Sequence, residues 1–162
     1  MTYLLDDDVF IQAKNLHYAF AFCPAFWDWL DTANHQGIVF SIDKVAGDLQ
    51  GHQDGLAQWA RVRPNLFRAT DAAVLASLAT VSAWANGHPR YDRAAIAEFL
   101  SVTDSYLVAH AHATGYVVVT HETSAPLSKA RIKIPDACIA LGVQSITPFQ
   151  MLRTEAPQFV LA

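Results

Sequence analysis

The sequence predicts an α/β protein with a central, mostly parallel sheet. A short apolar run at residues 2–5 ends abruptly in three adjacent acids, as a central strand does at a functional edge. Residues 116–120 read Tyr-Val-Val-Val-Thr, and a β-branched run of this kind indicates a strand buried on both faces. Helical segments, among them an alanine-rich stretch at residues 71–85, separate the two strands. Strands that alternate with helices predict parallel pairing through right-handed crossovers.

The elements before the alanine-rich helix follow from capping and turn residues. We expect a short helix at residues 9–14, a loop at residues 15–22, and a longer helix with Pro24 near its first turn. Residues 38–40 form a possible second strand, after which Ser41 is expected to cap a helix that runs to residue 49. A further helix is expected at residues 54–61.

The second half of the chain begins with the alanine-rich helix, which Asn86-Gly87-His88-Pro89 closes. Asp92 is expected to cap the next helix, and another starts at residue 103 or 104 and ends at Gly115. After the strand at 116–120 come a short helix to residue 141, a last strand at 143–146 and a last helix at 148–153.

Length and composition limit the possible classes of protein. A chain of 162 residues fits one domain, residues 1–162, which is large enough to bury a core. Hydrophobic residues make up 52% and the mean hydropathy is +0.18, yet no apolar stretch reaches the roughly 18 residues of a membrane span. The apolar excess indicates a well-buried sheet or a surface covered by a partner.

Charge and cysteine content point to a cytoplasmic protein with no large duplex-binding surface. The net charge is −4 and the isoelectric point is about 5.9, whereas a nonspecific nucleic-acid binder is normally basic. The first residues have no basic region and no small-residue cleavage site, so no signal peptide is expected. Cys23 and Cys138 fit reduced thiols, although one disulfide stays open on sequence grounds.

Five acids stand out, and four of their positions are expected near the same edge of a parallel sheet. They follow strands or lie at or near the helices next to them: Asp6, Asp48, Asp104, Glu122 and Asp136. Carboxylates that converge repel each other, and a hard divalent cation removes that cost by taking oxygen ligands. The sequence therefore predicts a Mg²⁺ or Mn²⁺ site at the carboxyl edge of the sheet, able to activate water against a phosphodiester.

Each of these acids also has a purely structural interpretation. An aspartate at a helix start, as at Asp104 or Asp136, is usually a cap, and Asp48 taken alone is a solvated helix residue. The basic stretch Lys129, Arg131 and Lys133 holds phosphates near the metals or is simply a solvated loop. The triple acid at residues 6–8 is harder to explain by a simple turn, and the prediction depends on the combination.

Four groups of segments between Tyr3 and about Arg153 form an ordered set of motifs: residues 3–11, residues 41–49, residues 104–109 with 115–122, and residues 133–138 with 141–143. In this order they resemble the motifs of the PIN-like nucleases, and in particular of a PIN-like family found next to antitoxin-type regulators in bacteria. The resemblance implies a three-layer α/β/α fold with a central, mostly parallel sheet of about four to five strands.

The resemblance also implies roles for individual residues. Asp6, Asp48, Asp104 and Glu122 would be the catalytic metal-binding acids, with Asp136 a further ligand and Thr120 a polar residue near the metal and substrate. Two departures stand out. Asp8 replaces an asparagine that normally steadies the first acid, and as a carboxylate it is an acceptor that can itself bind metal. Asp48 stands where the family usually has glutamate.

These observations predict a metal-dependent endoribonuclease that hydrolyses RNA phosphodiester bonds. The resemblance adds the role of toxin in a toxin–antitoxin module, with an antitoxin that carries a helix-turn-helix domain, and a homodimer is a further expectation. One alternative is a catalytically inactive PIN-like binding module. The other is a phosphoacceptor receiver-like domain, which ranks lower because no aspartate is expected directly after a mid-chain strand.

Overall fold

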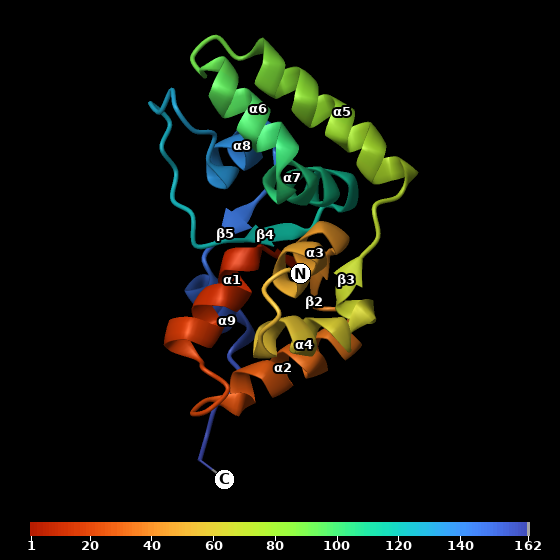
Figure 1. Ribbon diagram of the computed structural model, residues 1–162, viewed down its shortest axis with the longest axis vertical. Helices are drawn as coiled ribbons and strands as arrows, with labels where there is room; N and C mark the ends of the chain where they lie inside the picture. The colour runs from red at the N-terminus through yellow and green to blue at the C-terminus, as the bar shows by residue number, and fades with distance from the viewer. Residues whose placement is uncertain (162) are drawn as a thin grey trace.

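The structure, a computed structural model, describes residues 1–161 and has a five-stranded sheet at its centre (Figure 1). The strands stand in the order β3-β2-β1-β4-β5, and every neighbouring pair is parallel. Their bounds are Tyr3–Leu5 for β1, Val39–Ile42 for β2, Phe67–Arg68 for β3, Val117–Val119 for β4 and Ser145–Ile146 for β5. The predicted parallel α/β sheet is therefore confirmed.

Helices cover both faces of this sheet and make a three-layer α/β/α fold (Figure 1). One layer holds α1 (Asp7–Gln12), α2 (Pro24–His35), α4 (Gly55–Arg61) and α9 (Pro148–Glu155). The other holds α5 (Ala72–Gly87), α6 (Arg93–Ser101), α7 (Thr103–Thr114) and α8 (Ile134–Ala140). Helix α3 (Asp43–Gln50) follows β2 and packs against α1, α4 and α7. Within residues 1–161, no helix is both long and apolar enough to cross a bilayer.

The core lies where the central strands meet the two helix layers. Every residue of β1 is fully buried, and so are Val118 and Val119 of β4. Burial on both faces explains why these strands are continuous apolar runs without alternation. Most of the aromatic segment from Tyr18 to Trp29 also belongs to the core, because Phe26 and Trp27 are buried and stack with Tyr18 and Phe20.

One prediction around β2 is wrong, and the strand beside it was not predicted. Ser41 does not cap a helix: it lies in β2, and its hydroxyl donates to the Leu5 carbonyl oxygen across 2.6 Å. The helix starts at Asp43 instead, because the strand runs two residues further than its apolar run indicates. The edge strand β3 was not predicted at all, since two residues carry no readable periodicity.

The segment after β1 also differs from the prediction. Helix α1 starts at Asp7, two residues early, because the Asp6 side chain caps it by accepting from the Asp7 backbone N–H at 2.8 Å. A π-helical turn, Ala13–His17, then occupies the first part of the expected loop. The early helix start makes Asp6 the N-cap and places Asp7 and Asp8 in the first turn of α1.

Candidate functional site

The sheet reverses its direction of growth between β1 and β4. From β1 the chain builds β2 and β3 on one side and then returns to add β4 and β5 on the other. In open α/β sheets, ligand sites lie beyond the carboxyl ends of the strands at such a switch point. Asp6 follows β1 and Thr120 follows β4, and the Asp6 N–H donates to the Val119 carbonyl oxygen at 2.9 Å.

Asp6 and Asp8 are joined across this switch point by Thr120. The buried Thr120 hydroxyl lies 2.8 Å from Oδ2 of Asp6 and 3.2 Å from Oδ2 of Asp8. Asp8 also accepts from the His121 backbone N–H, at 3.1 Å from Oδ2. The end of β1, the first turn of α1 and the end of β4 are thus fastened by side chains that sequence analysis assigned to the site.

Asp104 and Glu122 reach the same region from α7 and from the segment after β4. Burial raises the pKa of Asp104 to about 7, and the neighbouring charges of Glu122, Asp7 and Asp8 act in the same direction. Burial also raises the pKa of Glu122, against the nearby Lys133 and Arg131. The Glu122 oxygen Oε1 is buried and has no hydrogen-bond partner among residues 1–161. A buried acceptor without a donor is costly unless another group, such as a cation, satisfies it.

The carboxylates at the start of the chain are affected in the same way. Burial raises the pKa of Asp6 well above its usual range, and the charges of Asp8, Asp7 and Asp104 add to this effect. Burial also raises the pKa of Asp8, to about 6, despite hydrogen bonds from His121 and Thr120. The protein therefore brings negative charges together without supplying enough positive charge to balance them.

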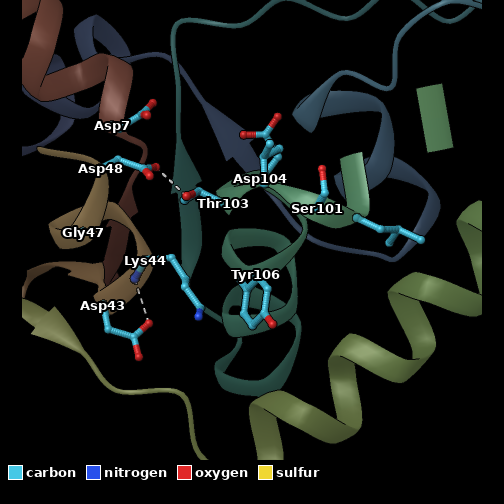
Figure 2. Close-up of a pocket in the computed structure, with 11 residues that line it drawn as sticks. Asp7, Asp43, Lys44, Gly47, Asp48, Ser101, Thr103, Asp104 and Tyr106 are labelled. Carbon is cyan, nitrogen blue, oxygen red and sulfur yellow. Dashed lines mark hydrogen bonds between the residues drawn. The ribbon is translucent and has the colours of Figure 1, made fainter. Parts of the chain in front are cut away.

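A cavity of about 790 Å³ opens beside these acids, between α3 and the start of α7 (Figure 2). Asp7, Asp48 and Asp104 line it, as the close-up shows. Helix α1 starts at Asp7, and the Asp7 side chain lines the cavity, although sequence analysis did not assign this residue to the site. Sequence analysis gave Asp7 no role, because the resemblance assigned metal binding to Asp6 and pointed to Asp8 only as a departure from the family pattern.

Asp48 joins the site through a contact between two helices. The Thr103 hydroxyl at the start of α7 donates a short hydrogen bond to Oδ2 of Asp48, near the end of α3. The charge of Asp48 also contributes to raising the pKa of Asp7, after burial and against a hydrogen bond with Asp6. Asp48 therefore lies at the cavity wall with one oxygen already engaged.

Asp136 is held apart from this cavity. Its carboxylate accepts from the Ser124 hydroxyl and, at 2.8 Å, from the Ala125 backbone N–H. It is largely buried in the first turn of α8 and is not part of the cavity wall. The structure thus gives Asp136 a visible role in fastening the loop after β4.

Of the three residues of the basic stretch, two lie near the acids of the site. Arg131 and Lys133 lie close enough to the acids to lower the pKa of Glu122, and Arg131 also acts on Asp104. Lys129 instead uses its carbonyl oxygen to accept from the Asp92 backbone N–H at 2.9 Å. This bond attaches the basic stretch to the N-cap of α6, and the bonds of Asp136 attach the preceding Ser124 and Ala125 to α8.

The side chains gathered here are carboxylates, the ligand type that oxygen-preferring divalent cations bind. Mg²⁺ keeps several waters and takes one or two protein carboxylates, and Mn²⁺ accepts the same ligands. Within residues 1–161, no group of three His, Cys, Asp or Glu side chains is close enough together to coordinate a metal ion. The unpartnered oxygen of Glu122 and the raised pKa values of Asp6, Asp8 and Asp104 are the observations that fit a cation here.

One premise used against the receiver-like alternative is wrong. Asp43 does directly follow a mid-chain strand, because β2 extends to Ile42. Its carboxylate is already engaged, however: Oδ2 accepts from the Thr70 backbone N–H at 3.0 Å, and Oδ1 from the Lys44 backbone N–H at 2.8 Å.

Comparison with known proteins gives one match. The model of a family described as "Domain of unknown function (DUF4411)" matches residues 3–159. A search of curated proteins and a search of solved structures each found no match.

Proposed function

The chain belongs to the DUF4411 family, described as a domain of unknown function, and we propose from the chemistry of its site that it is a metal-dependent endoribonuclease. The observation that carries the proposal is the gathering of carboxylates at the β1/β4 switch point with raised pKa values. Ionised carboxylates this close together repel one another, and a bound divalent cation removes that repulsion and stabilises the folded protein. The proposed reaction is hydrolysis of RNA phosphodiester bonds.

Under this proposal the site's residues divide the work. Asp6, Asp104 and Glu122 would hold Mg²⁺ or Mn²⁺, with Asp7, Asp8 and Asp48 as further acceptors directly or through water. A bound cation of this kind supplies an activated water and neutralises charge on the phosphate. Thr120 orients Asp6 through its 2.8 Å hydrogen bond. Arg131 and Lys133 are cations beside the acids, suited to hold the phosphate oxygens.

The biological setting is proposed on the resemblance to PIN-like nucleases. It comprises a toxin acting in the cytoplasm, an antitoxin with a helix-turn-helix domain, and possible pairing of two copies. Exposed apolar side chains such as Phe22, Leu127 and Ile139 fit a surface that a partner covers, although they stand on separate elements.

A catalytically inactive binding module is the second candidate. The observation that favours it is the hydrogen bond between Thr103 and Asp48, which occupies one oxygen of an acid expected to bind metal. The carboxylate of Asp8 in place of an amide adds one more charge to a site that is already repulsive. An inactive module would keep the fold and bind RNA without cutting it.

The experiment that tests the proposal compares purified protein with its Asp104→Asn variant. Both are incubated with labelled RNA and Mg²⁺ or Mn²⁺, with EDTA as the control. We expect cleavage by the parent only, and a rise in melting temperature on metal addition that the variant largely loses. A parent that neither cleaves RNA nor gains stability from either metal contradicts the proposal. Metal-dependent stabilisation without cleavage favours the inactive module.

A further inference from the structure

Resting on the proposed function, we infer that the cavity extends the site into a binding place for one nucleotide of single-stranded RNA, with Lys44 at its phosphate and Tyr106 at its base. In the view of Figure 2, Asp7, Asp48 and Asp104 lie toward one end of the cavity, and Lys44 and Tyr106 toward the other. A strand whose phosphate is held at the acids would continue past these two side chains.

Most of the cavity wall comes from α3 and α7, which are in contact, and α1 and α6 complete it. Lys44, Gly47 and Asp48 are three and four residues apart on α3, so they share one face of that helix. Asp104 and Tyr106 belong to the first turns of α7, which packs against α3. Helices α3 and α7 therefore present Asp48, Asp104 and the Lys44–Tyr106 pair to the same space.

The size of the cavity suits a nucleotide unit. Its volume of about 790 Å³ lies within the range of roughly 300–1,000 Å³ typical of small-molecule sites. Sequence-tolerant binding of single strands uses aromatic side chains as stacking platforms beside cations that follow the backbone. A base inside a duplex is already stacked on its neighbours and cannot enter such a space, so the inferred ligand is a single strand.

Lys44 and Tyr106 have the chemistry that this ligand requires. The Lys44 ammonium lies 4.8 Å from the centroid of the Tyr106 ring. Lys44 is exposed, and an exposed cation–π contact is weak enough to yield to a phosphate. In the described part of the chain, Lys44 forms no ion pair with a carboxylate. Movement of the ammonium onto the strand would release the ring face for a base.

Gly47 keeps the wall between these groups open. A Cβ added at Gly47 would meet no other atom within 4 Å, so the space beside the helix backbone is empty. Glycine inside a helix is less stable than alanine, and no steric reason in the structure requires it at this position. A glycine at this position leaves room for a ligand beside α3.

The first test fills this space with a charged side chain. Gly47→Glu is compared with Gly55→Glu, because Gly55 also lies in a helix with open space around it but is not part of the cavity wall. Binding of a short fluorescein-labelled single-stranded RNA is followed by anisotropy in Ca²⁺ and in EDTA. We expect Gly47→Glu to weaken binding at least about tenfold and Gly55→Glu to leave it unchanged. Circular dichroism confirms that both variants fold.

The second test addresses the roles of the two side chains. Tyr106→Leu should weaken binding about tenfold, and Tyr106→Phe, which keeps the ring, should bind like the parent. A strand with an abasic residue at the stacked position should be insensitive to Tyr106→Leu. Lys44→Met should reduce the dependence of binding on salt by about one phosphate contact, whereas Lys44→Arg should not.

The outcomes separate this inference from the proposed function. If the parent binds and cleaves RNA while the Gly47→Glu, Tyr106→Leu and Lys44→Met variants bind it equally well, the nucleotide site is refuted and the nuclease stands. If the parent binds no RNA in either condition, the site is refuted as well, and the cleavage assay decides the proposed function separately. Weaker binding by all three variants, with unchanged binding by their controls, supports the inference.

Discussion

At the scale of single residues, Asp6 is the side chain on which the site depends most. It is 2% exposed, it accepts from the Asp7 N–H and from the Thr120 hydroxyl, and burial together with three neighbouring acids raises its pKa. Asp6→Asn keeps the shape and one strong acceptor while it removes the charge. Without metal, we expect the melting temperature to rise by about 2–4 °C for each kcal/mol of repulsion relieved. RNA cleavage should fall by orders of magnitude, because the ligand charge and the activated water are lost together.

Differential scanning fluorimetry in EDTA and a cleavage assay in Mn²⁺ check this prediction for Asp6→Asn.

The Asp8→Asn variant tests the neighbouring acid in the same two assays. That change restores the amide usual in the resembling family and leaves one oxygen for the His121 N–H, so we expect activity to be kept or raised. Asp7→Asn should now reduce activity, because Asp7 lines the cavity. An Asp6→Asn protein that cleaves as fast as the parent would end the nuclease interpretation.

At the scale of elements, the change in stability of the metal-free protein on replacing Asp136 distinguishes a role in fastening the loop from a role in metal binding. Its two hydrogen bonds hold the loop after β4 to the first turn of α8. If fastening is its role, Asp136→Ala should destabilise the metal-free protein by about 1–3 kcal/mol. A metal-ligand role predicts the opposite, a gain in stability without metal. Asp92→Ala is the matched control, because Asp92 is the N-cap residue before α6 and its side chain makes no capping hydrogen bond, so its loss should change stability little.

The elements also show how far the sequence leads. The strands β1 and β4 and the helix α5 were predicted, since burial on both faces and helical composition leave clear patterns. The edge strand β3 and the extension of β2 to Ile42 were not, because pairing with neighbours decides them. For the site, acids after strands pointed to Asp6 and Glu122. The cavity face of Lys44 and Tyr106 depends on how α3 meets α7, which no spacing reveals.

At the scale of the whole molecule, the site makes stability depend on pH and metal together. The pKa of Asp104 is raised to about 7 and that of Asp8 to about 6, above their unfolded values near 3.8. Between pH 4 and 7 the folded state therefore binds more protons than the unfolded state, so this contribution to stability falls as pH rises. Without metal, the contribution of Asp104 and Asp8 to the free energy of unfolding should be largest near pH 4 and lost above pH 7.

The buried His110 opposes this trend, because burial lowers its pKa and favours folding at higher pH. The prediction therefore concerns the difference in melting temperature between the parent and Asp104→Asn, because the contribution of His110 is common to both proteins and cancels. In EDTA, the melting temperature of the variant relative to that of the parent should increase by a few degrees as pH rises from 5 to 8. Mn²⁺ should stabilise the parent more at pH 8 than at pH 5, since protons and metal compete for the same carboxylates. Melting curves at both pH values measure this, and metal stabilisation that is equal at both, or larger at pH 5, would mean that the ion binds elsewhere.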